Sequence, residues 1–577
     1  MTIKVFRTFA SQKMLSLFRA NLLAMLVAYL ALLSDSLIAG NMLGEEALVA
    51  INLASPFLTF IVFTGMMISV GTNIAFADEV GRGRRDQAVL YFNQSLIVGL
   101  GAGSALTAAY LGLYFAVPNL FGIGAELNAF FREYLWYVIL MTLPLMADMI
   151  LYDLILIEGG ELTCSVASVV QVVGNIGLSI WFCRLMGIGG IGLGSLVSSL
   201  LTCLILGSFF LKKSTQLYLK WFLNAKAVLR VIKYSLVDAG GFFFMGAMQL
   251  TLNVFLLRCF GQDATVTFAV VINLMALGIA CFDNLGEAIM PLIRVYRGEG
   301  GQRGILKTMA AANRVALFES LIVAAILMAA AGFIPGLFGI STPELAAETR
   351  QAVRIFALSC VPVAFVMLYS SYFLYQDRIA LSLGAAALYL LVFPVALGIP
   401  FGLSFGLKGV WTALALSAPA ALLLCGARVW RHRGGLGFPL LLDRSSPARE
   451  LSYDVPKTKD GIMKLVYRLE EDLRAEGTPE KTIFRIMLMV EETEMYAIEN
   501  KEEPKAVIEC TVFLGEEITL ILRDSGEERF EMNEDAEPGS LNGYVFTRLL
   551  ASQRDKKYVL TCGNNRVIYK FRQETGI

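Results

Sequence analysis

The chain has 577 residues, of which 56% are hydrophobic and only 17% are charged. A soluble protein carries about 25% charged residues, so most of this chain is expected to lie in lipid. The formal net charge is zero, which excludes a general basic field for nucleic acid. The one histidine, His432, lies in a basic run, and the nine cysteines form no CxxC pair. Histidine-based catalysis in the membrane and a cysteine-based zinc site are therefore excluded, and no metal ligands are expected.

Long apolar segments fill the first 430 residues. A helix needs about 20 residues to cross the hydrocarbon core of a bilayer, and every backbone amide in lipid must pair within its own segment. The sequence therefore predicts a polytopic membrane protein with twelve transmembrane helices. Their expected ranges are 15–40, 47–77, 87–117, 128–158, 161–186, 190–212, 228–260, 264–295, 309–338, 350–376, 378–401 and 407–430.

Lysine and arginine gather in the connections on one side of these predicted helices. They form groups at 4–13, 82–85, 212–226, 294–307 and 428–433, whereas connections such as 117–127 and 338–348 carry almost none. Basic connections face the cytoplasm. An even number of spans then places both termini inside the cell, and we expect a multi-pass protein of the plasma membrane.

The two halves of the predicted bundle repeat each other. Gly71 and Gly286 open similar stretches, as do Arg82 and Arg297, and both pairs are 215 residues apart (286 − 71 and 297 − 82). The stretches 186–191 and 405–410 also match, at an offset of 219 (405 − 186). Parallel repeats of this kind are typical of transporters that hold solute between two lobes. We expect one six-helix lobe over 1–218 and another over 219–434.

The composition changes to that of a soluble domain after a linker at 435–447. Alternating and amphipathic patterns then predict a two-layer α/β sandwich over 448–577. The expected strands are 450–455, 506–513, 517–523, 557–562 and 566–571, the last two forming a hairpin, and the expected helices are 458–476, 479–500 and 542–551.

Asp35 is the most informative charge in the predicted membrane part. It lies in the outer half of the first predicted helix, where an ionisable group costs several kcal/mol unless it faces water or a partner. Such a carboxylate can carry a proton or a monovalent cation and exchange it against a cationic substrate. The alternative is a hydrogen bond that caps or links helices.

Four amides accompany this carboxylate. Gln171 and Asn175 share a face of the helix predicted at 161–186; they either extend the Asp35 site or link helices. Gln249 and Asn253 share a face of the helix predicted at 228–260, and we expect them to line the cavity of the second lobe.

Residues 10–430 resemble the multidrug and toxic compound extrusion (MATE) family. The resemblance rests on the stretch 34–48, which is similar to the family's D-T-x-x-x-G…L-G-x-x-A-L motif, and on 69–83 and 286–298. It implies alternating access, export driven by a proton or sodium gradient, and Asp35 as the coupling residue. Some members carry further carboxylates where this chain has Gln249, Asn253 and Ser179, so the resemblance favours a single-carboxylate proton mechanism.

Residues 449–571 resemble the histidine-kinase-like ATPase fold, in its anti-sigma-factor-kinase branch. The matching stretches are 489–500, 523–526, 539–543 and 563–566. The resemblance implies that Asp524 binds adenine, that Gly526 and Gly543 lie near base and phosphates, and that Glu492 is a general base. Tyr496 replaces the family's magnesium-binding asparagine. An active enzyme, ATP binding without turnover, and a docking module for a cytoplasmic regulatory protein stay open, and the docking module is favoured.

The combined hypothesis is an antiporter rather than an enzyme. It would export small amphipathic, cationic solutes in exchange for protons or sodium, with its tail as a regulatory domain. One alternative is a flippase of lipid-linked glycans from the same superfamily. The other is a membrane-tethered signalling protein whose helices only sense.

Overall fold

The computed structural model describes the chain except for residues 1–7, 82–84, 117–123, 158–159, 212–223, 432–449, 499–502, 516, 525–555, 562–563 and 573–577. The chain divides into two compact units. One comprises residues 1–21, 284–315 and 429–577, and the other comprises residues 22–283 and 316–428. The predicted domains at 1–218, 219–434 and 448–577, and the linker at 435–447, stay predictions.

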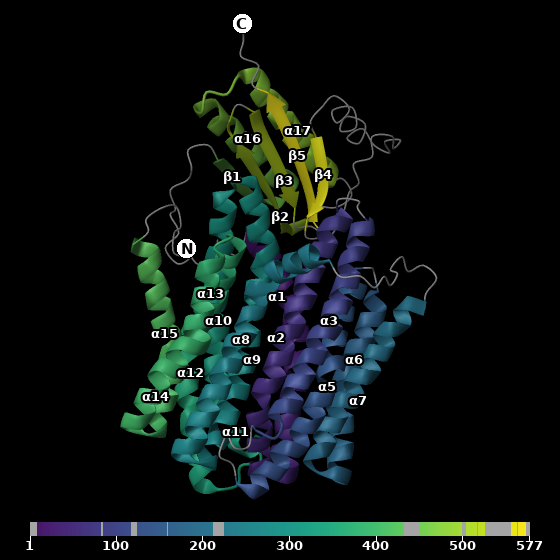
Figure 1. Ribbon diagram of the computed structural model, residues 1–577. Coiled ribbons are helices and arrows are strands. Elements are labelled where there is room, and N and C mark those ends of the chain that lie inside the picture. Colours follow the sequence, from purple (N-terminus) through teal and green to yellow (C-terminus); the bar gives the residue numbers. More distant parts are fainter. Residues whose placement is uncertain are drawn as a thin grey trace. The chain divides into compact units, whose positions relative to one another are not determined.

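Within the described residues, eleven helical segments are long and apolar enough to cross a membrane (Figure 1). A further helix of 35 residues, α1 (Phe9–Leu43), overlaps the first predicted span. Each predicted range thus coincides with a helix, whereas twelve crossings and two lobes stay predictions. The eleven segments are formed by α2 (Glu45–Gly81), α3 (Arg85–Leu113), α5 (Ala125–Ile157), α6 (Glu161–Met186), α7 (Ile188–Ser208), α8 (Ala225–Phe260), α9 (Gln262–Glu299), α10 (Gln302–Ala330), α12 (Pro343–Tyr375), α13 with α14 (Ile379–Ala387 and Phe393–Phe405) and α15 (Leu407–Arg431).

The matching stretches at 186–191 and 405–410 fold into the same helical corner. Gly187 between α6 and α7 has φ 66°, and Gly406 between α14 and α15 has φ 68°. These left-handed conformations favour glycine. Three residues later, a Cβ added to Gly190 or to Gly409 would lie 2.1 Å from a carbonyl oxygen of the preceding helix. The two corners therefore need glycine at the same two positions.

The C-terminal residues form a five-stranded sheet with two helices. The chain order is β1 (Glu450–Lys457), α16 (Lys459–Ala475), α17 (Glu480–Ala497), β2 (Glu503–Phe513), β3 (Glu517–Asp524), β4 (Lys556–Thr561) and β5 (Asn564–Arg572). The strands lie in the order β1-β2-β3-β5-β4, and every neighbouring pair is antiparallel. The predicted hairpin is present as β4 and β5, and the predicted helix at 542–551 lies outside the described residues.

One face of this sheet packs against α16 and α17. Ile508, Cys510 and Val512 of β2 join a single apolar core with residues of both helices. The amphipathic pattern of α16 explains this packing, because Ile462 and Leu469 of its apolar face are fully buried. The alternate residues of β2, among them Glu509 and Thr511, point to the other face and are also buried.

Candidate functional site

The carboxylate of Asp35 lies among polar side chains from three other helices. Its Oδ2 accepts hydrogen bonds from the hydroxyls of Tyr134 in α5 and Ser195 in α7, both at 3.0 Å. The Ser195 hydroxyl accepts a bond of 2.7 Å from Asn175 Nδ2 of α6. Ser34 next to Asp35 donates to Asn175 Oδ1 at 3.0 Å. Asp35 and Asn175, two of the predicted site residues, are thus linked through Ser195.

The second oxygen of Asp35 has no hydrogen-bond partner among the described residues. Asp35 Oδ1 is buried, and both donors to Oδ2 are uncharged hydroxyls. An ionised carboxylate in a low-dielectric site is costly unless it is paired and fully hydrogen-bonded. The described neighbours therefore provide hydrogen bonds to one oxygen of Asp35. The other oxygen can bind a proton or a small cation.

Close packing of α7 brings Ser195 to this carboxylate. A Cβ added to Gly194 would lie 2.5 Å from the backbone nitrogen of Ser179 in α6, and one added to Gly192 would lie 2.7 Å from Tyr137 in α5. Small residues let membrane helices approach each other in this way. Sequence reasoning missed Tyr134 and Ser195; the glycines at 189–194 are the signal that marks α7 as a closely packed helix.

The two predicted amides of α8, Gln249 and Asn253, form a separate, uncharged cluster with residues of α2. Gln249 Oε1 accepts from the hydroxyls of Ser55 and Thr59 at 3.3 and 3.2 Å. Asn253 and Asn52 bond reciprocally: Asn52 Nδ2 donates to Asn253 Oδ1 at 2.8 Å, and Asn253 Nδ2 donates to the Asn52 carbonyl at 3.2 Å. The predicted coupling and substrate residues therefore do not form one site, because Gln249 and Asn253 bond to α2 and not to Asp35. These predicted residues are Asp35, Gln171, Asn175, Gln249 and Asn253.

Two further contacts complete the surroundings of the carboxylate. Asn273 of α9 donates to the Ser36 hydroxyl at 3.2 Å, so a helix from the second half of the chain reaches the residue beside Asp35. Gln171 lies one turn before Asn175 on α6 and is partly exposed. It is not among the hydrogen-bonding partners of Asp35 or Asn175 in the described part of the chain.

In the tail, the residue expected to bind adenine faces a lysine. Asp524 at the end of β3 is buried, and its Oδ1 lies 3.4 Å from Lys457 Nζ of β1. Beside them Glu494 of α17 is buried, with Oε2 unpartnered among the described residues. Burial raises the pKa of Glu494 well above its ordinary value, and the Asp524 charge adds to the rise, whereas Lys457 opposes it.

The remaining predicted nucleotide residues give no complete site. Glu492 of α17 is partly exposed, and burial, assisted by the neighbouring Glu491, raises the pKa of its carboxyl. Gly526 and Gly543 lie outside the described residues. ATP binding by the tail therefore stays a prediction.

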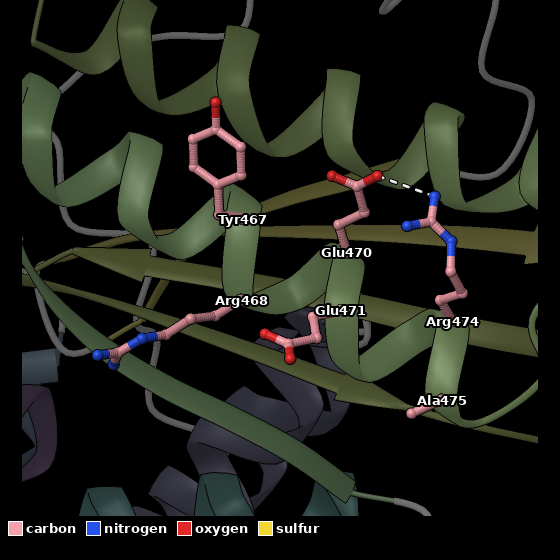
Figure 2. Close-up of a pocket in the computed structure, with 6 residues that line it drawn as sticks. All are labelled: Tyr467, Arg468, Glu470, Glu471, Arg474 and Ala475. Carbon is pink, nitrogen blue, oxygen red and sulfur yellow. Dashed lines mark hydrogen bonds and ion pairs between the residues drawn. The ribbon is translucent and has the colours of Figure 1, made fainter.

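A surface hollow on the tail is formed by one helix. Figure 2 shows that its lining residues all project from α16 and that Arg474 pairs with Glu470. Arg474 also pairs with Glu480. Arg474 and Glu480 are exposed and Glu470 is partly exposed, so these pairs add little to stability. The hollow contains neither Asp524 nor Glu492. Its lining residues are Tyr467, Arg468, Glu470, Glu471, Arg474 and Ala475.

The second face of the tail sheet carries a buried network of charges with the adjoining ends of α9 and α10. Glu509 of β2 accepts from the Tyr296 hydroxyl of α9 at 2.8 Å and from Arg523 of β3 at 2.9 Å. Arg523 also pairs with Glu299 of α9, and its guanidinium lies 5.0 Å from the centre of the Tyr296 ring. Arg566 of β5 pairs with the same Glu299. Each carboxylate here therefore faces at least one arginine.

The start of α10 is held by β1. Glu450 accepts from the backbone N–H groups of Gln302 and Arg303 at 3.0 and 3.2 Å, where a carboxylate complements the positive end of a helix dipole. Lys307, one turn later, pairs with Asp454 and lies 3.6 Å from Glu509. Burial raises the pKa of Asp454 although the Lys307 charge opposes the rise.

The tail also contacts the beginning of α1. The Phe9 N–H donates to Asp454 Oδ1 at 3.0 Å, and Gln12 Nε2 donates to the Lys505 carbonyl at 2.7 Å. One small domain thus binds α1, from the first half of the sequence, and the connection between α9 and α10, from the second half.

Comparison with known proteins identifies the fold of the membrane part. Residues 21–181 match the MatE family model. No curated protein matches the chain. An inward-facing multidrug resistance MATE family transporter of the MOP superfamily is similar, with a TM-score of 0.66 and 21% identity over 70% of this chain and 96% of that chain. The outward-facing conformation of such a transporter gives a TM-score of 0.60 and 21% identity, over 75% of this chain and 98% of that chain.

A third similar structure comes from Pyrococcus furiosus. It is a MOP superfamily transporter described as having a binding pocket of reverse polarity. Its TM-score is 0.60, with 20% identity over 75% of this chain and 98% of that chain. The matches cover nearly the whole length of each solved structure, whereas 25–30% of this chain lies outside them. The chain thus has the fold of MATE transporters, and it carries an additional C-terminal sheet domain.

Proposed function

We propose that the chain is a secondary-active antiporter that exports amphipathic, cationic solutes in exchange for protons or sodium by alternating access. The observation that carries this proposal is the arrangement around Asp35: among the described residues, one oxygen has two neutral donors and the other has none. Similarity to MATE transporters in both inward- and outward-facing conformations supports the same cycle.

The geometry suggests how the exchange proceeds. The hydroxyls of Tyr134 and Ser195 hold Asp35 Oδ2, so an incoming ion binds at Oδ1. With a proton or sodium ion bound, the carboxylate is neutral and can be enclosed in the membrane. When that ion leaves, the exposed negative charge attracts a cationic solute. One carboxylate thus binds either ion or solute, as antiport requires.

A proton is the ion that the described neighbours favour. Hard cations need several oxygen ligands around them, and no second carboxylate is among the side chains that bond to Asp35. A proton needs only the unpartnered oxygen. The coupling ion is therefore proposed to be H⁺, with sodium as the alternative.

Transport by purified protein in liposomes tests this proposal. Uptake of tetraphenylphosphonium would be measured under an imposed pH gradient and, separately, a sodium gradient, for the wild type and Asp35→Asn. We expect gradient-driven uptake in the wild type and the rate of empty liposomes in Asp35→Asn. Thr59→Val is the matched control, because Thr59 belongs to the uncharged cluster, and it should keep the ion dependence. Normal gradient-driven uptake by Asp35→Asn would refute the proposal.

We propose further that the tail is a regulatory domain that acts by holding α1 and the α9–α10 connection together. Alternating access requires the two repeated halves to move relative to each other. Asp454 of the sheet bonds to both, to Phe9 of α1 and to Lys307 of α10. Loosening these contacts should change the transport rate several-fold. Arg523→Ala tests this, with Arg474→Ala as the control because Arg474 is an exposed arginine of the same domain. Equal rates in both variants would argue against regulation by docking.

Nucleotide binding by the tail is a separate question. ATP titration of the full-length protein, with Asp524→Ala as control, decides it. A saturable signal that this substitution removes would support binding, and the Lys457 pairing makes us expect no such signal.

A further inference from the structure

A second carboxylate lies deep in the membrane part, in α10. Glu319 is the eighteenth residue of this helix of 29, so it lies about 25 Å along the axis at 1.5 Å per residue. Both of its carboxylate oxygens are buried, and neither has a hydrogen-bond partner among the described residues. This makes Glu319 more poorly satisfied than Asp35, which keeps two donors.

Glu319 forms no ion pair with a residue that the structure describes. Leu317 and Phe318 beside it are exposed on the surface of the helix, where lipid is expected. The Ser320 hydroxyl bonds within its own helix, to the Leu317 carbonyl at 3.1 Å. From α9, the thiol of Cys281 lies within electrostatic reach of the Glu319 carboxylate.

An ionised carboxylate cannot be kept in such a place without a partner. The cost of an isolated charge in lipid is several kcal/mol, and an unpaired polar group adds its own desolvation cost. Sodium would need several further oxygen ligands, whereas no described polar atom bonds to either oxygen of Glu319. A proton is the one ligand that removes the charge and needs no further ligand.

We propose that Glu319 is a second proton-binding site, which loads and releases a proton during the transport cycle in addition to the ion at Asp35. The inference rests on the proposed antiport. It places one exchangeable carboxylate in each sequence half: Asp35 in the first and Glu319 in the second. The consequence is a higher ratio of protons to solute, and hence a steeper solute gradient, than a single carboxylate sustains.

The ratio of proton flux to tetraphenylphosphonium flux in liposomes is the first test. Glu319→Gln should still transport under a pH gradient, but with about half the wild-type ratio if each carboxylate carries one proton. Glu319→Asp should restore the ratio. Glu344→Gln is the matched control, since Glu344 is exposed in the first turn of α12. An unchanged ratio in Glu319→Gln overturns the inference, whereas absence of ion-driven flux in the wild type overturns the antiport itself.

A chemical probe of the unmodified protein is the second test and does not depend on the folding of a variant. A hydrophobic carbodiimide adds to a protonated carboxyl group in lipid, and mass spectrometry locates the adduct. We expect labelling at Glu319 at neutral pH that decreases as the pH is raised. Absence of labelling at every pH would overturn the inference.

Discussion

The two buried acidic regions of this protein differ in what neutralises them. In the membrane part, the described residues that bond to Asp35 are two uncharged hydroxyls, and among these residues one oxygen has no partner. In the tail interface, Glu509 and Glu299 each face an arginine, and Asp454 faces Lys307. Among the described residues, no cationic side chain bonds to Asp35, whereas arginines and a lysine pair with the acidic residues of the tail interface.

This difference separates the proposed transport site from a structural contact. A carboxylate with a fixed cationic partner has no need of a mobile ion, so its pairing lasts through the cycle. A carboxylate that only neutral donors hold must take its compensating charge from solution when it is enclosed. The distinction explains why we assign ion exchange to Asp35 and docking to the tail residues.

The largest effect on stability should come from breaking the structural network. Arg523→Ala leaves Glu509 and Glu299 without one of their partners, and removal of one member of a buried pair costs about 3–5 kcal/mol. Hydrogen–deuterium exchange of β2 in the full-length protein should therefore become markedly faster. Arg474→Ala, which breaks exposed pairs, should leave it unchanged; equal exchange in both variants would mean that the buried network is not stabilising.

A smaller effect should follow from removing one donor at the transport site. Ser195→Ala deletes a hydrogen bond to a charged group, worth about 1.5–3 kcal/mol, and leaves the carboxylate in place. Because the charged form loses support, the proton should bind more tightly, and the pH at which transport is half-maximal should rise by about one to two units. Ser199→Ala, a buried serine one turn further along α7, is the control. A pH profile equal to that of the wild type would show that the Ser195 bond does not influence ion exchange.

The smallest effect concerns Glu494, which lies in the tail and whose pKa is raised by burial. A carboxyl group whose pKa is raised by folding stabilises the folded state fully when the pH is below its pKa in the unfolded chain, near 4.5. This stabilisation is lost as the pH rises through the higher pKa of the folded state. The α17 helix should thus exchange hydrogen faster at high pH, after correction for intrinsic rates. Glu494→Gln should abolish this pH dependence. If that variant kept the dependence, another group would be responsible.

Part of the candidate site could be predicted from the sequence. Asp35 and Asn175 are detectable because polar residues are conspicuous in apolar helices, and the structure joins them through Ser195. Tyr134 and Ser195 are not detectable in this way, because hydroxyl side chains are common in membrane helices. Their role depends on the close approach of α7, which glycines such as Gly194 permit.

The positions of the elements were more predictable than their partners. Apolar length located the membrane helices, and the alternation of residues located the tail strands. The spacing of polar residues could not show that Gln249 and Asn253 bond to α2. A polar helix face indicates a polar neighbour, but the sequence does not indicate which helix provides it. It also could not show the covered second face of the tail sheet: Glu509 and Arg523 look solvent-exposed in sequence, although both are buried by Tyr296 and Glu299.

The most direct test of the central claim is to add solute to purified protein and measure the ion that it displaces. Tetraphenylphosphonium would be added to the wild type and to Asp35→Asn in weakly buffered detergent solution. Proton release would be recorded with a pH indicator and sodium release with an ion-selective electrode. The account predicts solute-dependent release from the wild type and none from Asp35→Asn, because the solute and the ion compete for this carboxylate. Equal release from both proteins would contradict it.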